Sequence, residues 1–361
     1  MNRKPKIAII GTAGLPARYG GFETLADFLT QNLSDRFEFT VYCPRPTQGN
    51  APKTYNDAHL VYLNFKANGV QSIIYDIVSI LISIFRYDKL LILGAGGSII
   101  LPLLFPFRQK FILNFGGLEW KREKWNGLTR AYLKLSERLG VHFSTKVVAD
   151  NQVFLDYVRS EYGVTSSLIE YGGDHCVAPD GLTPAVLERY PFLGGSYFLS
   201  VSRAQEDNNI HMLLEGFYNR PARKLVIISN WDSSEYGRML KQKYTGVENL
   251  ILVDAVYDLE ILNFIRSRCF VYIHSHSFCG TAPSLVEIMS LGKPVLAFSA
   301  PTNLETTERK AEYFHSSTDL INLVERLSES DYLRMGTQMH EIASRRYTWK
   351  IITDKYFDIL N

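Results

Sequence analysis

The chain has 361 residues, enough for two domains of ordinary size. Hydrophobic residues make up 46% and charged residues 21%, the balance of a globular protein, and a net charge of +2 gives no whole-molecule attraction for nucleic acid. The four cysteines include no CxxC pair, and no Cys/His cluster has the usual zinc spacing, which argues against a secreted disulfide framework and a zinc site. We therefore expect reduced thiols in a cytoplasm and no bound metal.

The first half of the chain alternates short apolar runs with segments of helical periodicity. Apolar runs without polar alternation are typical of parallel strands that are buried on both faces. The helix expected after the first run places Phe22, Leu25 and Leu29 on one face. We expect strands at 6–11, 37–43, 59–65, 89–94, 110–115, 146–150 and 167–171.

The first expected loop, 11–23, is rich in glycine, and Gly20 and Gly21 open the helix that follows. Glycines let backbone N–H groups approach a ligand closely, and a helix N-terminus favours an anion. Neither the dinucleotide fingerprint nor the Gly-Lys-Ser/Thr phosphate motif is present. A plain tight turn remains an alternative, but Arg18 and Tyr19 beside the glycines favour contact with a ligand.

The most apolar segment is 70–87. Asp76, several serines and Arg86 interrupt it, which argues against a membrane span. Two interpretations remain open: a helix buried in the protein, or a helix that rests on a membrane surface.

A second glycine cluster, 93–98, follows another expected strand. It departs from the dinucleotide signature at Ile99, and close packing of a helix against the sheet is the favoured role.

The segment 116–125 also follows an expected strand and combines aromatic, cationic and acidic side chains. Trp120 and Arg122 are of the types that bind a sugar or a phosphorylated acceptor, although a solvated basic helix start is the alternative. Glu119 lies where a loop carboxylate could reach a sugar hydroxyl.

Prolines and glycines break the rhythm at 176–196, which indicates a connection between domains. Two strand–helix series predict two Rossmann-like, doubly wound α/β domains. Ligands of such sheets bind beyond the carboxyl ends of the strands, so we expect the two domains to face each other across a cleft. The second series has strands at 197–202, 224–229, 249–254, 269–274 and 294–298.

The segment 274–298 carries the strongest signal. A strand enters a loop of small residues, and a helix is expected to begin near 281–284, where its N-terminus could stabilise a diphosphate. Gly280 permits close approach, and Glu287 could accept hydrogen bonds from a ribose hydroxyl. Arg203, at the end of the first strand of the second series, could clamp phosphates and neutralise a leaving group.

These motifs together resemble the retaining glycosyltransferases of family four, which have the GT-B fold. The donor-binding segment of that family resembles HSFCGTAPSLVEIMSLGKPV, at 276–295. A narrower subgroup, the bacterial rhamnosyltransferase-like proteins, is similar over nearly the whole chain. The similar motifs are IIGTAGLPARYGGFETL, GLEWKREKW, ADNQVFLDY, SVSRAQEDNNIHMLLEGF, HSHSFCGTAPSLVE and NLETTE.

The resemblance implies roles for individual residues. It implies that Arg203 binds phosphate, that Glu287 holds the ribose, and that Gly280 and Thr281 lie at the diphosphate. It places Gly20 and Gly21 in a ligand-contacting loop of the first domain. The residues expected to bind the donor are therefore Gly20, Gly21, Arg203, Cys279, Gly280, Thr281 and Glu287; those expected at the acceptor are Arg18, Tyr19, Trp120 and Arg122; and Arg203 and Glu119 are expected to be catalytic.

The sequence also departs from the family pattern. Cys279 stands where the first glutamate of a paired motif is expected, and Asn208 stands where a phosphate-binding lysine is expected. The histidine usual after a strand of the first domain has no clear match. A deoxy sugar such as rhamnose would need fewer polar contacts, which fits these losses.

The expected enzyme transfers a hexosyl group, rhamnosyl being the best guess, with retained configuration and without a metal. The donor would be a dTDP- or UDP-sugar, with no separate cofactor, and the acceptor a glycan or lipid-linked oligosaccharide in surface polysaccharide synthesis. We expect an acceptor-binding domain at 1–178, a donor-binding domain at 179–345, and a C-terminal helix at 346–361 that packs back on the first. The expected location is the cytoplasm, with peripheral association at the inner face of the plasma membrane left open.

Three alternatives belong to other classes. The chain could be a nucleotide-sugar epimerase of similar build, or a non-catalytic protein that binds a nucleotide sugar. The third is a Rossmann oxidoreductase. Neither glycine cluster has the dinucleotide-binding fingerprint, which argues against it.

Overall fold

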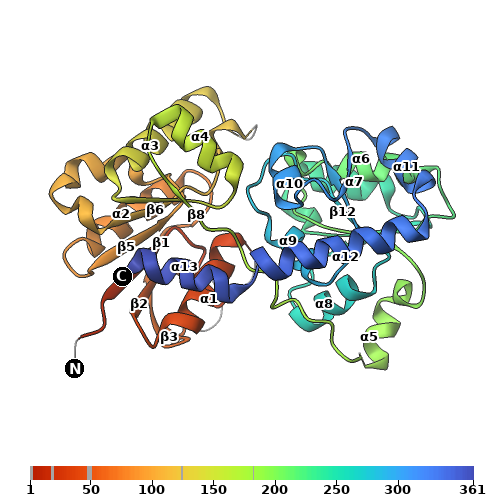
Figure 1. Ribbon diagram of the computed structural model, residues 1–361, viewed down its shortest axis with the longest axis horizontal. Coiled ribbons are helices and arrows are strands. Elements are labelled where there is room, and N and C mark those ends of the chain that lie inside the picture. The colour runs from red at the N-terminus through yellow and green to blue at the C-terminus, as the bar shows by residue number, and fades with distance from the viewer. Residues whose placement is uncertain (1–2, 18–19, 47–50, 123–124, 182) are drawn as a thin grey trace. The chain divides into compact units, whose positions relative to one another are not determined.

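The computed structural model describes residues 3–17, 20–46, 51–122, 125–181 and 183–361. The chain forms two compact units: unit 1 comprises Met1–Tyr171 together with Lys350–Asn361, and unit 2 comprises Gly172–Trp349. Each unit has a sheet with helices on both of its faces (Figure 1). The two doubly wound α/β domains predicted from the sequence are confirmed.

The sheet of unit 1 has eight strands in the order β3-β4-β2-β1-β5-β6-β7-β8. All neighbours pair in parallel except β3, which is antiparallel to β4. Central strands such as β1 and β5 are buried along most of their length, as their apolar sequences predict. The strands are β1 (Lys6–Ile10), β2 (Glu38–Pro44), β3 (Thr54–Tyr55), β4 (Ala58–Leu63), β5 (Lys89–Leu93), β6 (Phe111–Asn114), β7 (Lys146–Ala149) and β8 (Ser167–Leu168).

Local sequence signals explain several helix boundaries of unit 1. The Asn126 side chain caps the next helix by accepting from the Thr129 N–H at 2.9 Å, and Asn151 does the same for Val153. Pro102 and Pro106 interrupt any α-helical ladder, so their segment is 3-10 helix. The helices are α1 (Gly21–Leu33), α2 (Gln71–Ser83), α3 (Gly127–Phe143), α4 (Gln152–Tyr162) and α13 (Trp349–Leu360), with 3-10 helices η1 (Ser98–Lys110) and η2 (Glu119–Lys121).

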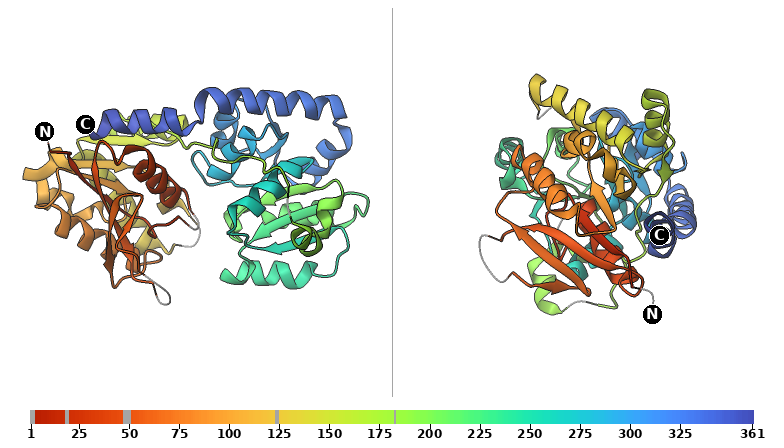
Figure 2. Two further views of the ribbon diagram at one scale, coloured as in Figure 1. Left: turned by 90° about the horizontal axis from the view of Figure 1, so that it is seen from below. Right: turned by 90° about the vertical axis from the view of Figure 1, so that its left-hand side faces the viewer.

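The last helix, α13, packs on unit 1 although it is the final element of the chain. Asn114, at the end of β6, donates to the Tyr356 hydroxyl at 2.7 Å, and both side chains are buried. Lys146, at the start of β7, donates to the Ile359 carbonyl at 2.9 Å. Both chain ends therefore belong to the same unit (Figure 2).

The sheet of unit 2 has six strands in the order β11-β10-β9-β12-β13-β14, all parallel. Its core includes Phe198, Phe217 and Trp231, all nearly inaccessible to solvent. The strands are β9 (Phe198–Val201), β10 (Leu225–Ser229), β11 (Leu250–Asp254), β12 (Val271–His274), β13 (Val295–Phe298) and β14 (Glu312–Phe314).

The helices of unit 2 follow its strands in alternation, and the longest has a complete capping box. The Ser328 hydroxyl accepts from the Asp331 N–H while the Asp331 carboxylate accepts from the Ser328 N–H. The helices are α5 (Pro184–Arg189), α6 (Ile210–Tyr218), α7 (Glu235–Tyr244), α8 (Leu259–Arg268), α9 (Pro283–Ser290), α10 (Pro301–Thr306), α11 (Ser317–Arg326) and α12 (Glu329–Arg346), with 3-10 helices η3 (Pro191–Gly194), η4 (Glu206–Asn208) and η5 (Trp231–Ser233).

The segment 70–87 forms α2 and the turn after it, and it is only partly buried. Tyr75 and Ile80 are in the core, whereas Leu81 and Phe85 are exposed. Throughout the described ranges, no helix combines the length and apolar character that a bilayer crossing requires.

The glycine cluster after β5 packs closely against α2, the role that the sequence favoured. A Cβ at Gly97 would lie 2.5 Å from the Cβ of Asp76 and 3.1 Å from the backbone nitrogen of Ile77. Asp76 itself is buried, and burial raises the pKa of its carboxyl well above the usual value.

We expect Gly97→Ala to lower the free energy of unfolding by about 1–3 kcal/mol, because α2 must move to make room for a methyl group. The matched control is Gly127→Ala, since nothing lies within 4 Å of a Cβ at that position. Urea unfolding of both variants measures the effect. Equal stabilities would contradict the close contact between Gly97 and α2.

Candidate active site

The strand order of each sheet reverses at one place, and the candidate residues lie there. In unit 2, β9, β10 and β11 run outward to one side, and the chain then crosses so that β12 pairs with the other side of β9. The loops after β9 and β12 leave the sheet at this reversal, and the region beyond the carboxyl ends of the strands there is the usual ligand site of such sheets. Arg203 follows β9, and Cys279, Gly280 and Thr281 follow β12.

Hydrogen bonds tie these two loops together. The Asn209 amide donates to the Ser275 carbonyl at 2.9 Å, and the Ser277 hydroxyl donates to the Asp207 carbonyl at 2.8 Å. Asn208 is buried, and its amide donates to the Arg203 carbonyl at 2.9 Å. Asn208, which replaces the lysine of the family pattern, therefore holds the backbone of Arg203 in place.

The donor-binding candidates in these loops differ in accessibility. Arg203 is exposed, Gly280 and Thr281 are buried, and Cys279 is partly exposed. Helix α9 begins at Pro283 after Ala282, which offers no side-chain cap to the first N–H groups. This leaves the positive end of the helix dipole without a capping side chain at the end of the loop.

Glu287, on α9, is buried, and both of its carboxylate oxygens have partners within unit 2. Oε2 pairs with the Arg266 guanidinium from α8, and Oε1 lies 3.2 Å from Nε2 of His175. Arg266 is 4% exposed, so its charge depends on this carboxylate for compensation. The predicted contact of Glu287 with a ribose stays a prediction; its pairing with Arg266 is a role that the sequence did not indicate.

The hydrogen bonds of His175 fix its tautomer. The Trp349 indole N–H donates to Nδ1 of His175 at 2.9 Å, and the Trp349 backbone N–H donates to Asp174 at 2.8 Å. Because Nδ1 accepts a hydrogen bond, the ring proton is on Nε2 and points at Glu287. One carboxylate thus connects α8, α9, the segment 174–175 and the end of unit 2.

Opposing effects act on the pKa of Glu287. Burial alone would raise it, but Arg266 and the hydrogen bond from His175 outweigh burial and lower it to about 2. Close by, Cys176 donates to Asn263 at 3.0 Å, and burial raises the pKa of its thiol to about 11. The thiol is therefore protonated at neutral pH.

Unit 1 has its own reversal of strand order, between β1 and β5, and both predicted glycine loops lie there. Gly20 precedes α1 with φ 123°, a conformation that favours glycine. A Cβ at Gly20 would lie 2.0 Å from the Glu23 carboxylate, whose other oxygen accepts from the Ala13 N–H at 2.5 Å. The buried Glu23 thus holds the loop closed; Arg18 and Tyr19 lie outside the described residues.

In the described part of the segment 116–125, Glu119, Arg122 and Trp125 contact one another. The Glu119 carboxylate lies 2.9 Å from Nε of Arg122 and accepts from the Trp125 indole N–H at 3.1 Å. The ring centroid of Trp120 is 4.7 Å from the Lys134 ammonium of α3. The structure thus brings the predicted catalytic carboxylate and the predicted acceptor-binding Arg122 together, while Trp120 faces Lys134.

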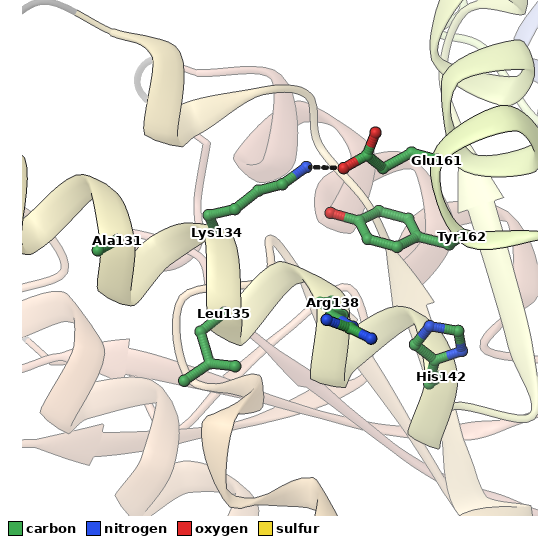
Figure 3. A pocket seen from close by; sticks show the side chains of 7 residues that line it. All are labelled: Ala131, Lys134, Leu135, Arg138, His142, Glu161 and Tyr162. Atoms are coloured by element: carbon green, nitrogen blue, oxygen red, sulfur yellow. Dashed lines mark ion pairs between the residues drawn. The ribbon is translucent and has the colours of Figure 1, made fainter.

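Unit 1 also has a hollow of about 700 Å³ on α3 and α4 (Figure 3). The Lys134 ammonium and the Glu161 carboxylate form an ion pair of 2.9 Å at its wall. None of the predicted site residues lines it. The lining residues are Ala131, Lys134, Leu135, Arg138, His142, Glu161 and Tyr162.

The sequence did not indicate the roles of Arg266 and His175, nor the role of Glu23 in holding its own loop. Arg266 lies in the last turn of α8 with no surrounding motif, and His175 directly precedes the segment 176–196 that was interpreted as a connection. Glu23 offered a signal: a carboxylate three residues after Gly20 in a loop-to-helix junction could have been recognised as closing that loop.

Two family models match the chain. Residues 4–174 match Domain of unknown function (DUF1972), and residues 191–343 match Glycosyl transferases group 1. No curated protein matches the chain.

Several solved structures share the fold. Sucrose-phosphate synthase from Thermosynechococcus elongatus is similar with a TM-score of 0.80 at 15% identity, over 99% of this chain and 98% of that one. Anabaena Alr3699/HepE in complex with UDP-glucose is similar with a TM-score of 0.75 at 16% identity, over 99% of each chain. The α,α-trehalose 6-phosphate synthase from Burkholderia multivorans gives 0.71 at 10% identity, over 99% of this chain and 96% of that one.

These findings identify the class of protein. The two Rossmann-like units form the GT-B fold. The chain has a group 1 glycosyltransferase domain at 191–343, preceded by a DUF1972 domain at 4–174. The predicted fold and enzyme class are confirmed.

We expect Glu287→Gln to lower the free energy of unfolding at neutral pH by about 3–5 kcal/mol, because Arg266 is then buried without a counter-charge. The folded-state pKa of Glu287, about 2, lies below its ordinary value of 4.5. The carboxylate therefore contributes stability that is present above pH 4.5 and is lost as the pH falls toward 2. This part of the acid dependence should disappear in the variant.

Urea unfolding between neutral and acid pH measures both effects. The control is Glu325→Gln, which removes a surface pair with Arg220 and should cost no more than about 1 kcal/mol. If the Gln variant kept the acid dependence of the native chain, the assignment of that dependence to Glu287 would be wrong.

Proposed function

We propose that the chain transfers a hexosyl group from a nucleoside-diphosphate sugar to a hydroxyl of a glycan or lipid-linked oligosaccharide. The observation that carries the proposal is the position of Arg203 and the 279–281 loop at the strand-order reversal of the group 1 glycosyltransferase unit. The Anabaena relative in complex with UDP-glucose supports a uridine nucleotide in the donor, and dTDP is the alternative base. The rhamnosyl-transferring subgroup that the sequence resembles supports rhamnose as the sugar and surface polysaccharide synthesis as the role.

The proposed reaction breaks the bond between the anomeric carbon and the diphosphate oxygen. Negative charge develops on the leaving diphosphate, where the Arg203 guanidinium and the first N–H groups of α9 supply positive charge. With retained configuration, the departing phosphate itself takes the proton of the acceptor hydroxyl. No side-chain nucleophile is required.

The remaining candidate residues have supporting parts in this proposal. Gly280 and Thr281 line the path of the diphosphate, and Cys279 contacts the donor sugar through its backbone. In unit 1, Glu119 and Trp120 bind the acceptor, with Arg122 holding the Glu119 carboxylate in position.

Thermal-shift measurements with UDP-, dTDP- and GDP-sugars on EDTA-treated protein test the donor. We expect one nucleotide to stabilise the chain selectively, because binding to the native state alone raises the melting temperature. We expect the nucleotide to stabilise the protein in EDTA as well, because Arg203 and the N-terminus of α9 supply the positive charge at the diphosphate. Equal responses to all three nucleotides would contradict the proposal.

We expect Arg203→Ala to lower kcat/KM about 100-fold or more, as removal of a group that stabilises developing charge does. Its side chain is exposed, so the melting temperature should not change. Arg220→Ala, which removes a surface arginine paired with Glu325, is the matched control and should keep full activity. Conversion of the donor to a new nucleotide sugar without acceptor would favour the epimerase alternative instead.

We further propose that unit 1 rests on an acidic membrane surface through an apolar face formed by the end of α2 and by η1. Phe85, Leu103 and Phe105 are 79%, 81% and 51% exposed. The Phe85 ring packs on Phe107 with centroids 5.1 Å apart, which joins the two elements. Cationic side chains lie among these residues: Arg86 is exposed, and the Arg108 guanidinium lies 5.6 Å from the Phe105 ring. Exposed apolar side chains surrounded by cationic side chains suit binding at the surface of an anionic bilayer.

Vesicle flotation tests this face. The chain should bind vesicles of phosphatidylglycerol more tightly than vesicles of phosphatidylcholine, and binding should weaken as salt rises. Replacement of both Phe85 and Leu103 by serine should lower vesicle affinity at least about tenfold, since each inserted side chain contributes about 1.5–3 kcal/mol. Leu333→Ser, on a 68% exposed position of α12, is the control. Equal binding by the native chain and the double variant would exclude this face.

A further inference from the structure

Two histidines and a cysteine meet at the carboxyl end of β12. His274 is the last residue of the strand, and His276 follows two positions later, so an extended chain directs both to the same side. Cys279 lies in the loop that leads to α9. One ligand atom from each of the three residues lies within 4.8 Å of the others, and the two imidazole centroids are 4.3 Å apart.

The Cys279 sulfur faces His274 and Asn303. Nε2 of His274 and Oδ1 of Asn303 each lie 3.9 Å from it. Asn303 is fully buried, and its amide donates to the carbonyls of His276 at 2.8 Å and of Phe298 at 2.9 Å. A buried side chain thus fixes the backbone of the loop that carries His276.

His274 is 1% exposed, and its Nδ1 has no hydrogen-bond partner among the described residues. The protein therefore does not determine which ring nitrogen carries the proton. The tautomer that leaves Nε2 unprotonated, facing Cys279, is available to a metal ion.

We propose that His274, His276 and Cys279 bind a zinc ion. Two imidazole nitrogens and a thiolate form a donor set that zinc accepts, whereas magnesium requires oxygen ligands. Zinc–nitrogen bonds are about 2.0–2.1 Å and zinc–sulfur bonds about 2.3 Å, so the ligand atoms would draw together by roughly 1 Å. Binding releases the proton of the Cys279 thiol to solvent and leaves one tetrahedral position for a water molecule.

The sequence lacks pairs of ligands at the spacing of zinc fingers, so no metal was expected. The pattern here is His-x-His-x-x-Cys, in which the first two ligands come from a strand end and the third from a short loop. Zinc bound there would join β12 to the loop before α9. The proposal concerns binding alone and does not depend on the sugar transferred or on activity.

Cobalt(II) titration of the full-length, untagged protein, stripped of metal with EDTA and then freed of chelator, tests the site. We expect one equivalent to bind, with a thiolate-to-cobalt charge-transfer band and the visible bands of a tetrahedral ion. Zinc should displace the cobalt and abolish both. Absence of a thiolate band in the native chain would overturn the proposal.

Variants assign the ligands. Cys279→Ser should abolish the charge-transfer band, and His276→Gln should weaken cobalt binding more than about tenfold. Cys43→Ala and His59→Gln, which change a buried cysteine and an exposed histidine of unit 1, are the matched controls and should bind as the native chain does. Equal binding by all four variants would show that the metal sits elsewhere and would also overturn the proposal.

Thiol modification gives a second measurement that does not depend on any variant. Cys43, Cys176 and Cys269 are buried and Cys279 is partly exposed, so one cysteine should react fast with a disulfide reagent. One equivalent of zinc should slow that reaction more than about tenfold. Modification at an unchanged rate in zinc would contradict binding through the Cys279 sulfur.

Discussion

The order of parallel strands is the constraint on which the candidate site depends. A parallel strand cannot return by a tight turn, so each connection crosses a face of the sheet and every strand ends at the same edge. Where the order reverses, two loops leave in opposite directions and expose the sheet end between them. The chain does this twice, between β1 and β5 and between β9 and β12. Its glycine-rich loops, Arg203 and the 275–282 segment all lie at these two reversals.

Inside unit 2, a single carboxylate connects the parts behind the site. Charges as deeply buried as Glu287 and Arg266 are costly to desolvate, and an ion pair compensates only when both members are present. His175 and Trp349 complete the hydrogen bonding on the other side of the carboxylate. A residue that the family pattern associates with ligand binding is therefore also a structural centre, so loss of activity in its variants does not by itself report contact with the donor.

Much of the fold could be predicted from the sequence because apolar runs and Gly/Pro breaks act locally. The twelve expected strands are all present, whereas β3 and β14, of two and three residues, were not expected. The glycine loops and Arg203 could be placed because they directly follow strands. The partners of Glu287 could not: Arg266 and His175 are 21 and 112 residues away in sequence, and only tertiary packing brings them together. The pairing of Glu119 with Arg122 is local, but it depends on a 3-10 turn that no periodicity signals.

The assignment of α13 to unit 1 has a consequence for biosynthesis. A growing polypeptide leaves the ribosome from its N-terminus, and its leading domain usually folds first. Here the partners of Asn114 and Lys146 are supplied by Tyr356 and Ile359, which are translated 242 and 213 residues later. Unit 1 therefore waits for α13 before these two hydrogen bonds form, while the inserted unit 2 has all of its strands available earlier. The packing of unit 1 is thereby completed only after unit 2 has been synthesised.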